Sequence, residues 1–87
     1  MTENVWVIDD DQSIRWVLDR ALSKAGIPIS AFNTADQAMH HLHAENPLAI
    51  LTDIRMDGMS GLEFLEKGNE SHPNVPIIVM TAHSDLD

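Results

Sequence analysis

An apolar run at residues 48–52 leads directly to a carboxylate, Asp53, and then breaks into a polar turn that contains Gly58. A short apolar run between turn signals is typical of a strand buried in a parallel sheet. In such sheets, ligands bind just beyond the carboxyl ends of the strands. The sequence therefore predicts that Asp53 lies at a binding or reactive site.

The rest of the chain alternates further strand-like runs with helical patterns. Strands are expected at residues 5–8, 28–32 and 75–80, and the second suits a sheet edge because it begins with Pro28. Apolar residues recur at helical spacing between the strands: Ile14, Val17, Leu18, Ala21, Leu22 and Ala25, then Ala35, Ala38, Met39 and Leu42, then Leu62 and Leu65. The chain thus follows the order β-α-β-α-β-α-β.

The predicted helices share a start signal, a side chain that can cap the first turn: Asp11 or Ser13 in the first, Thr34 in the second and Ser60 in the third. Gln37 and Glu63 complete capping boxes in the second and third helices. Gly68 and Asn69 interrupt the third apolar pattern, so we expect that helix to be short or frayed at its end.

This element order defines an α/β fold. Right-handed crossovers between the strands would build one parallel sheet with helices on both faces. In a flavodoxin-like strand order, 2-1-3-4, the first and third strands are neighbours. Asp9, Asp10 and Asp53 would then meet at one edge of the sheet, with Thr81 beside them. A chain of 87 residues, 44% of them hydrophobic, allows one such domain.

Converging carboxylates require a compensating charge. Two carboxylates about 4 Å apart repel each other by roughly 4 kcal/mol at an effective dielectric constant of about 20, so the cluster favours a cation or a proton. Mg²⁺ is the natural occupant, because it prefers oxygen ligands and uses one or two carboxylates. A carboxylate can also attack phosphorus to form an aspartyl phosphate. Together these properties indicate phosphoryl transfer.

Composition restricts the partners. Five Lys and Arg stand against fourteen Asp and Glu, and the net charge of -9 opposes direct contact with nucleic acid or anionic lipid. The lack of cysteine excludes disulfides and thiolate metal sites. No apolar run approaches the roughly 20 residues that span a bilayer, and the amino terminus has no basic leader. We therefore expect a soluble, cytoplasmic, unprocessed protein without membrane contact, whose role in gene control would be indirect.

Three segments together resemble the receiver domain of two-component response regulators, and among these the nitrogen-regulatory, NtrC-type activators. The segments are residues 7–15, 53–61 and 78–87. They hold, in order, an acidic triplet after the first strand, an Asp after the third strand and a Thr after the fourth. The resemblance extends over the whole chain, and three motifs in the correct order are much more specific than any one of them.

The resemblance implies that Asp53 accepts a phosphoryl group from a sensor histidine kinase. It implies that Asp10 binds Mg²⁺ directly and that Asp9, the other member of the acidic pair, helps through water. Asp53 and the backbone carbonyl of Arg55 would be further Mg²⁺ ligands, and Thr81 matches the switch hydroxyl of the family. Downstream ATPase and DNA-binding domains in the parent protein are implied in the same way. Such a domain is not an enzyme beyond Mg²⁺-dependent phosphorylation and dephosphorylation of itself.

The chain departs from the family at two points. A typical receiver continues to a fifth strand that carries a Lys, so residues 1–87 are expected to be an incomplete receiver domain, either part of a longer protein or a truncation. Lys24 and Lys67 are expected to be surface charges instead. In a truncation, the fourth strand would be an exposed apolar edge that favours a homodimer or a swapped oligomer. Asp57 stands where the family usually has Pro and adds negative charge near the site.

Two other function classes stay open. A haloacid-dehalogenase-like phosphohydrolase is suggested because residues 9–13 satisfy a D-x-D-x-S pattern and the run before Thr81 resembles that family's second motif. Its later Lys and second acidic motif are absent, and Asp53 precedes Thr81, which is the wrong order. The third class is a non-phosphorylated fragment that only dimerises.

The histidines could suggest a metal site: His40, His41, His43, His72 and His83. Mg²⁺ does not favour imidazole, so we interpret these residues as solvated surface. Trp6 is expected in the core. Trp16 and Arg15 fall off the apolar stripe of the first helix, so Trp16 is either partly exposed packing or a partner contact.

Overall fold

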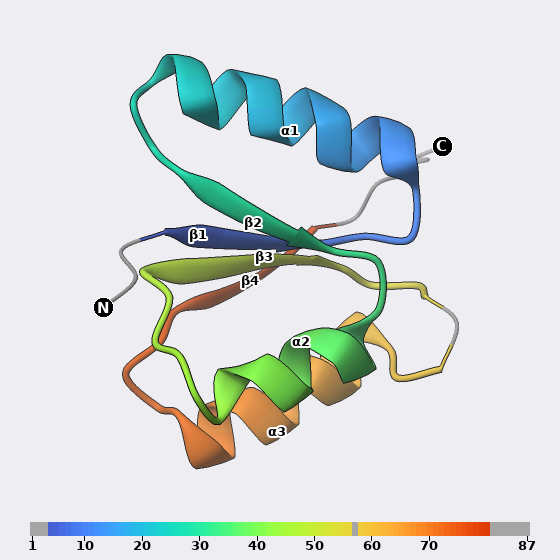
Figure 1. Ribbon diagram of the computed structural model, residues 1–87. Helices are drawn as coiled ribbons and strands as arrows, with labels where there is room; N and C mark the ends of the chain where they lie inside the picture. The colour runs from blue at the N-terminus through green and yellow to red at the C-terminus, as the bar shows by residue number, and fades with distance from the viewer. Residues whose placement is uncertain (1–3, 57, 81–87) are drawn as a thin grey trace.

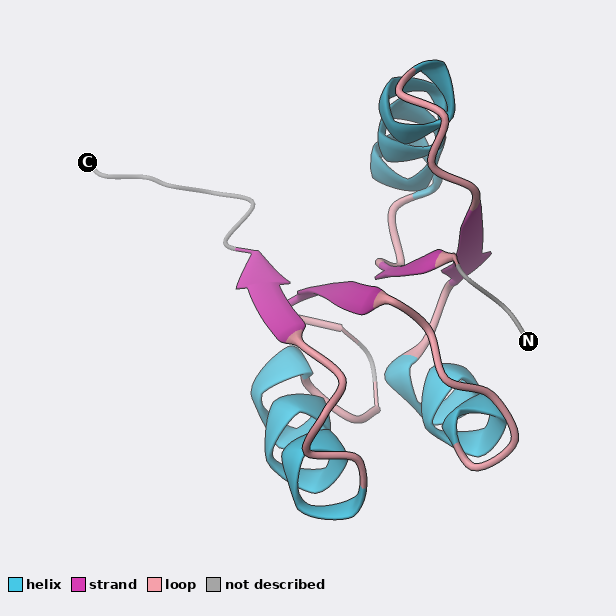
Figure 2. Cartoon of the chain, turned by 90° about the vertical axis from the view of Figure 1, so that its left-hand side faces the viewer, coloured by secondary structure: helices cyan, strands magenta, loops and turns pink. Residues whose placement is uncertain are grey.

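The computed structural model describes residues 4–56 and 58–80, and strands alternate with helices throughout this part of the chain. The elements in chain order are β1 (Val5–Ile8), α1 (Gln12–Lys24), β2 (Ile29–Phe32), α2 (Ala35–Leu42), β3 (Ala49–Asp53), α3 (Gly61–Ser71) and β4 (Ile77–Met80). Figure 1 shows α1 on one side of the sheet and α2 and α3 on the other, and the turned view in Figure 2 agrees. Among the described residues, no helix has both the length and the apolar character needed to cross a bilayer.

The four described strands form one parallel sheet in the order β2-β1-β3-β4, which confirms the predicted order. Prolines stand just before both edge strands, where the sheet needs no N–H donor from them. Their carbonyls nevertheless accept from the neighbouring strands: Pro28 from the N–H of Val5 at 3.0 Å and Pro76 from that of Ile50 at 2.9 Å. Strand pairing therefore begins at these prolines, although they have no N–H group to donate. The edge position predicted from Pro28 is confirmed.

Each helix begins at a side chain that accepts a hydrogen bond from the first turn. Asp11, rather than Ser13, caps α1 and accepts from the Ser13 N–H at 2.8 Å. Thr34 and Ser60 cap α2 and α3 and each accept at 3.1 Å, from the N–H groups of Gln37 and Glu63. These caps satisfy backbone donors that have no partner within the helix, and they fix where each helix leaves the preceding loop.

Helix α3 is longer than predicted, because it continues through Gly68 and Asn69 to Ser71. Gly68 is buried, and a Cβ atom there would lie 2.5 Å from Cδ1 of Ile77 in β4. The glycine therefore permits close packing of the helix against the strand. The predicted fraying was wrong because this tertiary contact outweighs the low helix propensity of glycine.

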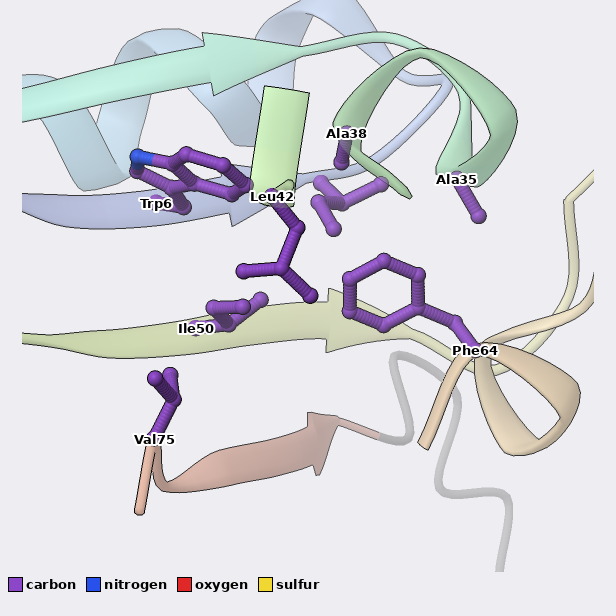
Figure 3. Packing of buried hydrophobic residues seen from close by; sticks show 8 residues of the cluster. Trp6, Ala35, Ala38, Leu42, Ile50, Phe64 and Val75 are labelled. Carbon is purple, nitrogen blue, oxygen red and sulfur yellow. The ribbon is translucent and has the colours of Figure 1, made fainter. Parts of the chain in front are cut away.

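The hydrophobic core lies between the sheet and the pair α2 and α3 (Figure 3). It contains Trp6, Ile8, Ala35, Ala38, Leu42, Ile50, Phe64 and Val75, and none of these side chains is more than 6% exposed. The Trp6 and Phe32 rings pack at a tilt with centroids 4.8 Å apart. The prediction that Trp6 lies in the core is confirmed.

Helix α1 packs much less deeply than its apolar pattern predicted. In the described part of the chain, none of its thirteen residues is buried. Ile14, Leu18 and Leu22 are half-buried, whereas Val17 and Ala21 are exposed. Helical spacing identifies the side of the helix that turns to the sheet, but α1 alone covers this sheet face in the described residues, so the flanks of its apolar stripe meet solvent.

Candidate functional site

Asp9 follows directly after β1 and is only 2% exposed. Its Oδ1 atom accepts the backbone N–H of Asp11 at 2.9 Å. Its backbone carbonyl accepts a hydrogen bond from Nη1 of Arg15 at 2.6 Å. The loop between β1 and α1 is therefore fastened at both the side chain and the backbone of Asp9, which fixes the direction of the carboxylate.

Asp53 is the last residue of β3 and is half-buried. Ile8 pairs with Thr52 in the register between β1 and β3, so Asp9 and Asp53 come next on adjacent parallel strands. Oδ1 of Asp53 accepts the N–H of Ile54 at 2.8 Å, which orients the carboxylate at the start of its loop. The strand register alone thus brings these two acids to the same edge of the sheet.

Asp10 completes a cluster of three carboxylates. One oxygen from each of Asp9, Asp10 and Asp53 lies within 4.8 Å of the others, and the three side chains are buried, exposed and half-buried in that order. Among residues 4–56 and 58–80, this is the one group of three or more potential metal ligands that converges. The structure therefore brings together the three carboxylates that the sequence singled out, and all of their donors are hard oxygens.

The cluster carries unbalanced negative charge. Burial raises the pKa of Asp9 above its usual value of 3.8, and the negative charges of Asp53, Asp10 and Asp11 raise it further. The hydrogen bond from the Asp11 backbone acts in the opposite direction but does not cancel these effects. A buried carboxylate with a raised pKa is a group that a proton or a cation stabilises. The donor set and the electrostatics therefore both fit a hard divalent ion.

Thr81, Asp57 and His83 fall outside the described residues, so what the sequence predicts of them stays a prediction. Arg55 lies in the loop after Asp53 with an exposed side chain, and the part of its carbonyl as a ligand also stays a prediction. Lys24 and Lys67 are both exposed, as expected, and Lys67 pairs with Glu63 at 3.6 Å on the surface of α3.

The loop after Asp53 closes against the backbone of that residue. The N–H of Gly61 donates to the carbonyl of Ile54 at 2.9 Å. A Cβ atom at position 61 would collide with the carbonyl oxygen of Asp53 and lie 2.8 Å from its carbonyl carbon. Gly61 therefore allows the first turn of α3 to sit directly on the site. Gly58 in the same loop has φ of 79°, a conformation that favours glycine.

Sequence reasoning did not assign roles to Arg15 and Gly61. Arg15 stood out only because it falls off the apolar stripe of α1, a signal that shows its position but not its contact with the Asp9 carbonyl. Gly61 directly follows the capping residue Ser60, where a glycine has no helical advantage. Its position at the start of a helix was the available signal that two backbones approach closely there.

Comparison with known proteins agrees with this geometry. The sequence profile described as the response regulator receiver domain matches residues 5–87. A match over nearly the whole chain, together with the parallel α/β sheet and the acidic cluster at its carboxyl edge, defines the class. The chain belongs to the family of response regulator receiver domains.

Individual relatives refine this assignment. The chain is 51% identical over 83 residues to the DNA-binding transcriptional regulator NtrC of Salmonella typhimurium, which covers 95% of this chain but only 18% of that protein. The solution structure of the apo receiver domain of nitrogen regulatory protein C is 49% identical, with a TM-score of 0.83 over 98% of this chain and 68% of that one. The crystal structure of the response regulator TrrA from Thermotoga maritima, in complex with Mg²⁺ and BeF, is 29% identical, with a TM-score of 0.89 over 98% of this chain and 77% of that one.

Proposed function

We propose that this chain is a phosphoacceptor switch that receives a phosphoryl group on Asp53 from a sensor histidine kinase. The observation that carries the proposal is the convergence of Asp9, Asp10 and Asp53 within 4.8 Å at the carboxyl edge of the sheet. Phosphoryl transfer depends mainly on positioning and on neutralising charge, and this cluster supplies a positioned nucleophile beside ligands for a cation.

The three carboxylates have separate parts in this proposal. Asp10 would hold Mg²⁺ directly and Asp9 would act through water, while Asp53 and the carbonyl of Arg55 would be the further protein ligands. When bound, Mg²⁺ would neutralise the negative charge that the phosphoryl oxygens bring to the cluster. Two relatives support such a site: TrrA was solved in complex with Mg²⁺ and BeF, and the NtrC receiver domain was solved in a beryllofluoride-activated form.

The reaction is a displacement at phosphorus. A carboxylate oxygen of Asp53 forms the new P–O bond as the P–N bond to the kinase imidazole breaks, and the imidazole keeps that electron pair. The N–H of Ile54 holds Oδ1 of Asp53 and so fixes the carboxylate during the attack. The Arg15 contact holds the Asp9 loop in place, which keeps the ligands from spreading under their own repulsion.

The product would change the charge at the edge of the sheet. An aspartyl phosphate replaces one negative charge with roughly two, and in the proposed switch Thr81 turns its hydroxyl toward the phosphoryl group. Through this change, the domain would control a transcriptional activator whose ATPase and DNA-binding domains lie downstream in the parent protein, in a nitrogen-regulatory system. The net charge of -9 agrees with control of gene expression without direct nucleic acid contact by this part.

The family match favours this function over a haloacid-dehalogenase-like phosphohydrolase.

The described sheet ends with β4 as an edge strand whose Ile78 is 52% exposed. The homodimer or swapped oligomer predicted from the sequence therefore remains a proposal, which light scattering of the chain over a range of concentrations would test.

The test of the main proposal is phosphorylation by a small donor. The chain would be incubated with acetyl phosphate, with and without Mg²⁺, and intact mass would report the adduct. We expect a Mg²⁺-dependent phosphoryl adduct that is lost in Asp53→Asn and retained in Asp19→Asn, an exposed carboxylate on α1. A folded chain that gains no adduct would show that it has the receiver fold without the chemistry. An adduct that persists in Asp53→Asn would place the acceptor elsewhere.

A further inference from the structure

Two histidines lie close together at the far ends of α2 and α3. His43 is the C-terminal cap of α2, and His72 is the C-terminal cap of α3. Their ring centroids are 6.0 Å apart, and the ring planes are inclined by 52°. Both helices run from the carboxyl edge of the sheet back to the edge where the strands begin (Figure 1), so this pair is remote from the acidic cluster.

The separation of the rings is close to that of two imidazoles on one metal ion. A ring nitrogen binds Zn²⁺ at about 2.0–2.1 Å, so the ring centres of two imidazoles on one tetrahedral ion lie roughly 5.2 Å apart. The observed 6.0 Å is longer than this, so the exposed His43 ring would have to turn toward His72 for both to bind one ion. His43 is exposed and His72 is half-buried, so water can complete the coordination shell.

Hydrogen bonds around His72 prepare one ring nitrogen to bind a metal. The hydroxyl of Ser71 donates to the carbonyl of Lys67 at 3.0 Å. Oγ of Ser71 also lies 2.8 Å from Nδ1 of His72, and while the Ser71 proton is donated to Lys67 this contact requires the Nδ1–H tautomer of His72. This tautomer leaves Nε2 of His72 with a free lone pair at the tip of the ring. A hydrogen bond at the other ring nitrogen is the usual support for a metal-binding histidine.

The helix ends also favour a cation at this position. The last carbonyl groups of a helix carry partial negative charge, and α2 and α3 both end at this pair. The neighbouring pair His40 and His41 has a similar centroid distance of 5.9 Å but lacks this arrangement. Consecutive residues of one helix do not face each other, and the His41 ring packs against the Phe32 ring, with centroids 5.3 Å apart.

We propose that His43 and His72 form a surface site for one divalent transition-metal ion of the Zn²⁺ or Cu²⁺ kind, which ties together the C-terminal ends of α2 and α3. The site uses nitrogen ligands and is separate from the acidic cluster, whose oxygen ligands favour Mg²⁺. Zn²⁺ at His43 and His72 thus leaves the proposed phosphoacceptor site free.

The test is titration of the chain with ZnCl₂ by isothermal calorimetry at about pH 7.5, where most free imidazole is neutral. Excess Mg²⁺ would be present to occupy carboxylates. We expect saturable binding of one Zn²⁺ per chain, loss of that binding in His43→Gln and in His72→Gln, and an affinity about tenfold lower in Ser71→Ala. His40→Gln is the matched control on the same helix and should bind as the unaltered chain does.

A second measurement does not depend on the folding of variants. In the unaltered chain, the ring proton resonances of His43 and His72 should shift together on addition of Zn²⁺, while those of His40 stay in place. Absence of Zn²⁺ binding, persistence of it in both His43→Gln and His72→Gln, or loss of it in His40→Gln would overturn the proposal. Unchanged affinity in Ser71→Ala would overturn the part assigned to Ser71. Circular dichroism would check that each variant is folded.

Discussion

The two faces of the sheet are built differently. The face toward α2 and α3 encloses a continuous core in which Trp6, Ile50 and Phe64 are fully buried. On the opposite face, in the part of the chain that the structure describes, α1 contributes no buried residue, and Trp16 is 59% exposed beneath the guanidinium of Arg20. Apolar burial is the main stabilising contribution to folding, so stability is concentrated on one face.

The acidic site lies at the edge that both faces share. Asp9 leads into α1, whereas Asp53 leads into the loop that ends on α3. The site therefore joins a firmly packed element to a loosely packed one. This difference between the faces predicts unequal effects of substitutions, largest on the packed face and smallest on the outer side of α1.

The largest effect is expected from Phe64→Ala on the packed face. Phe64 has no exposed surface and lies within the core cluster, so its truncation removes buried area and leaves a cavity. We expect the free energy of unfolding to fall by about 3–5 kcal/mol, measured by urea denaturation. Phe64→Leu should cost less because it fills part of the space. If Phe64→Ala cost no more than a substitution on the outer side of α1, the two faces would not differ as described.

Gly61→Ala should have an intermediate effect, at the point where the packed face meets the site. The added methyl group would overlap the backbone of Asp53, and overpacking of this kind costs about 1–3 kcal/mol. The rate of phosphorylation by acetyl phosphate should fall as well, because Asp53 or α3 must move. Gly26→Ala is the control. Its φ of 80° also disfavours alanine, but no atom lies within 4 Å of the added Cβ, so phosphorylation should be unchanged.

A smaller effect, opposite in sign, is expected from Asp9→Asn in the absence of Mg²⁺. The pKa of Asp9 is raised in the folded chain, mainly by burial, so the folded state holds this proton more tightly than the unfolded state does. The free energy of unfolding of the unaltered chain is therefore lowered as pH rises from about 3.8 through the raised pKa, and the full cost is present above it. Asparagine avoids this cost.

We accordingly expect Asp9→Asn to have the higher midpoint of thermal unfolding at neutral pH, with the difference vanishing in acid. Added Mg²⁺ should stabilise the unaltered chain more than the variant. Asp19→Asn, an exposed carboxylate on α1, serves as control and should change the midpoint little. A variant that is less stable than the unaltered chain at every pH would show that Asp9 is not under electrostatic strain.

The smallest effect is expected from Val17→Ala on the outer side of α1. Val17 is 53% exposed, and the small loss of buried area is offset by the higher helix propensity of alanine. The free energy of unfolding should change by no more than about 0.5 kcal/mol in urea denaturation. Leu18→Ala, on the half-buried side of the same helix, should cost more. Equal losses in the two variants would mean that α1 has no preferred packing side.

The strand order and the meeting of the acids could be predicted from the sequence because both are local patterns. Each apolar run that stops at a carboxylate marks a strand and the edge at which it ends. The rule that crossovers are right-handed then gives a parallel sheet with helices on both faces. The caps at Asp11, Thr34 and Ser60 are equally local, since each accepts from a backbone group two or three residues ahead.

What could not be predicted depends on contacts between distant residues. The spacing of Val17 and Ala21 identifies one side of a helix but not how much sheet lies under it. Gly68 lowers helix propensity, yet the contact that fixes α3 around it involves Ile77, nine positions away along the chain. The hydrogen bond of Arg15 could not be predicted, because its acceptor is a backbone carbonyl, which every residue has.

The missing side chain at Gly61 gives the site a direct mechanical link to α3. The first turn of this helix rests on the peptide of Asp53 and is held to the next peptide by the hydrogen bond between Gly61 and Ile54. A larger residue at this position could change rotamer and absorb a small movement, whereas two backbones in contact have no such freedom. A displacement of the Asp53 peptide would therefore move α3 as a whole, because the peptide that contacts the helix directly follows the carboxylate side chain.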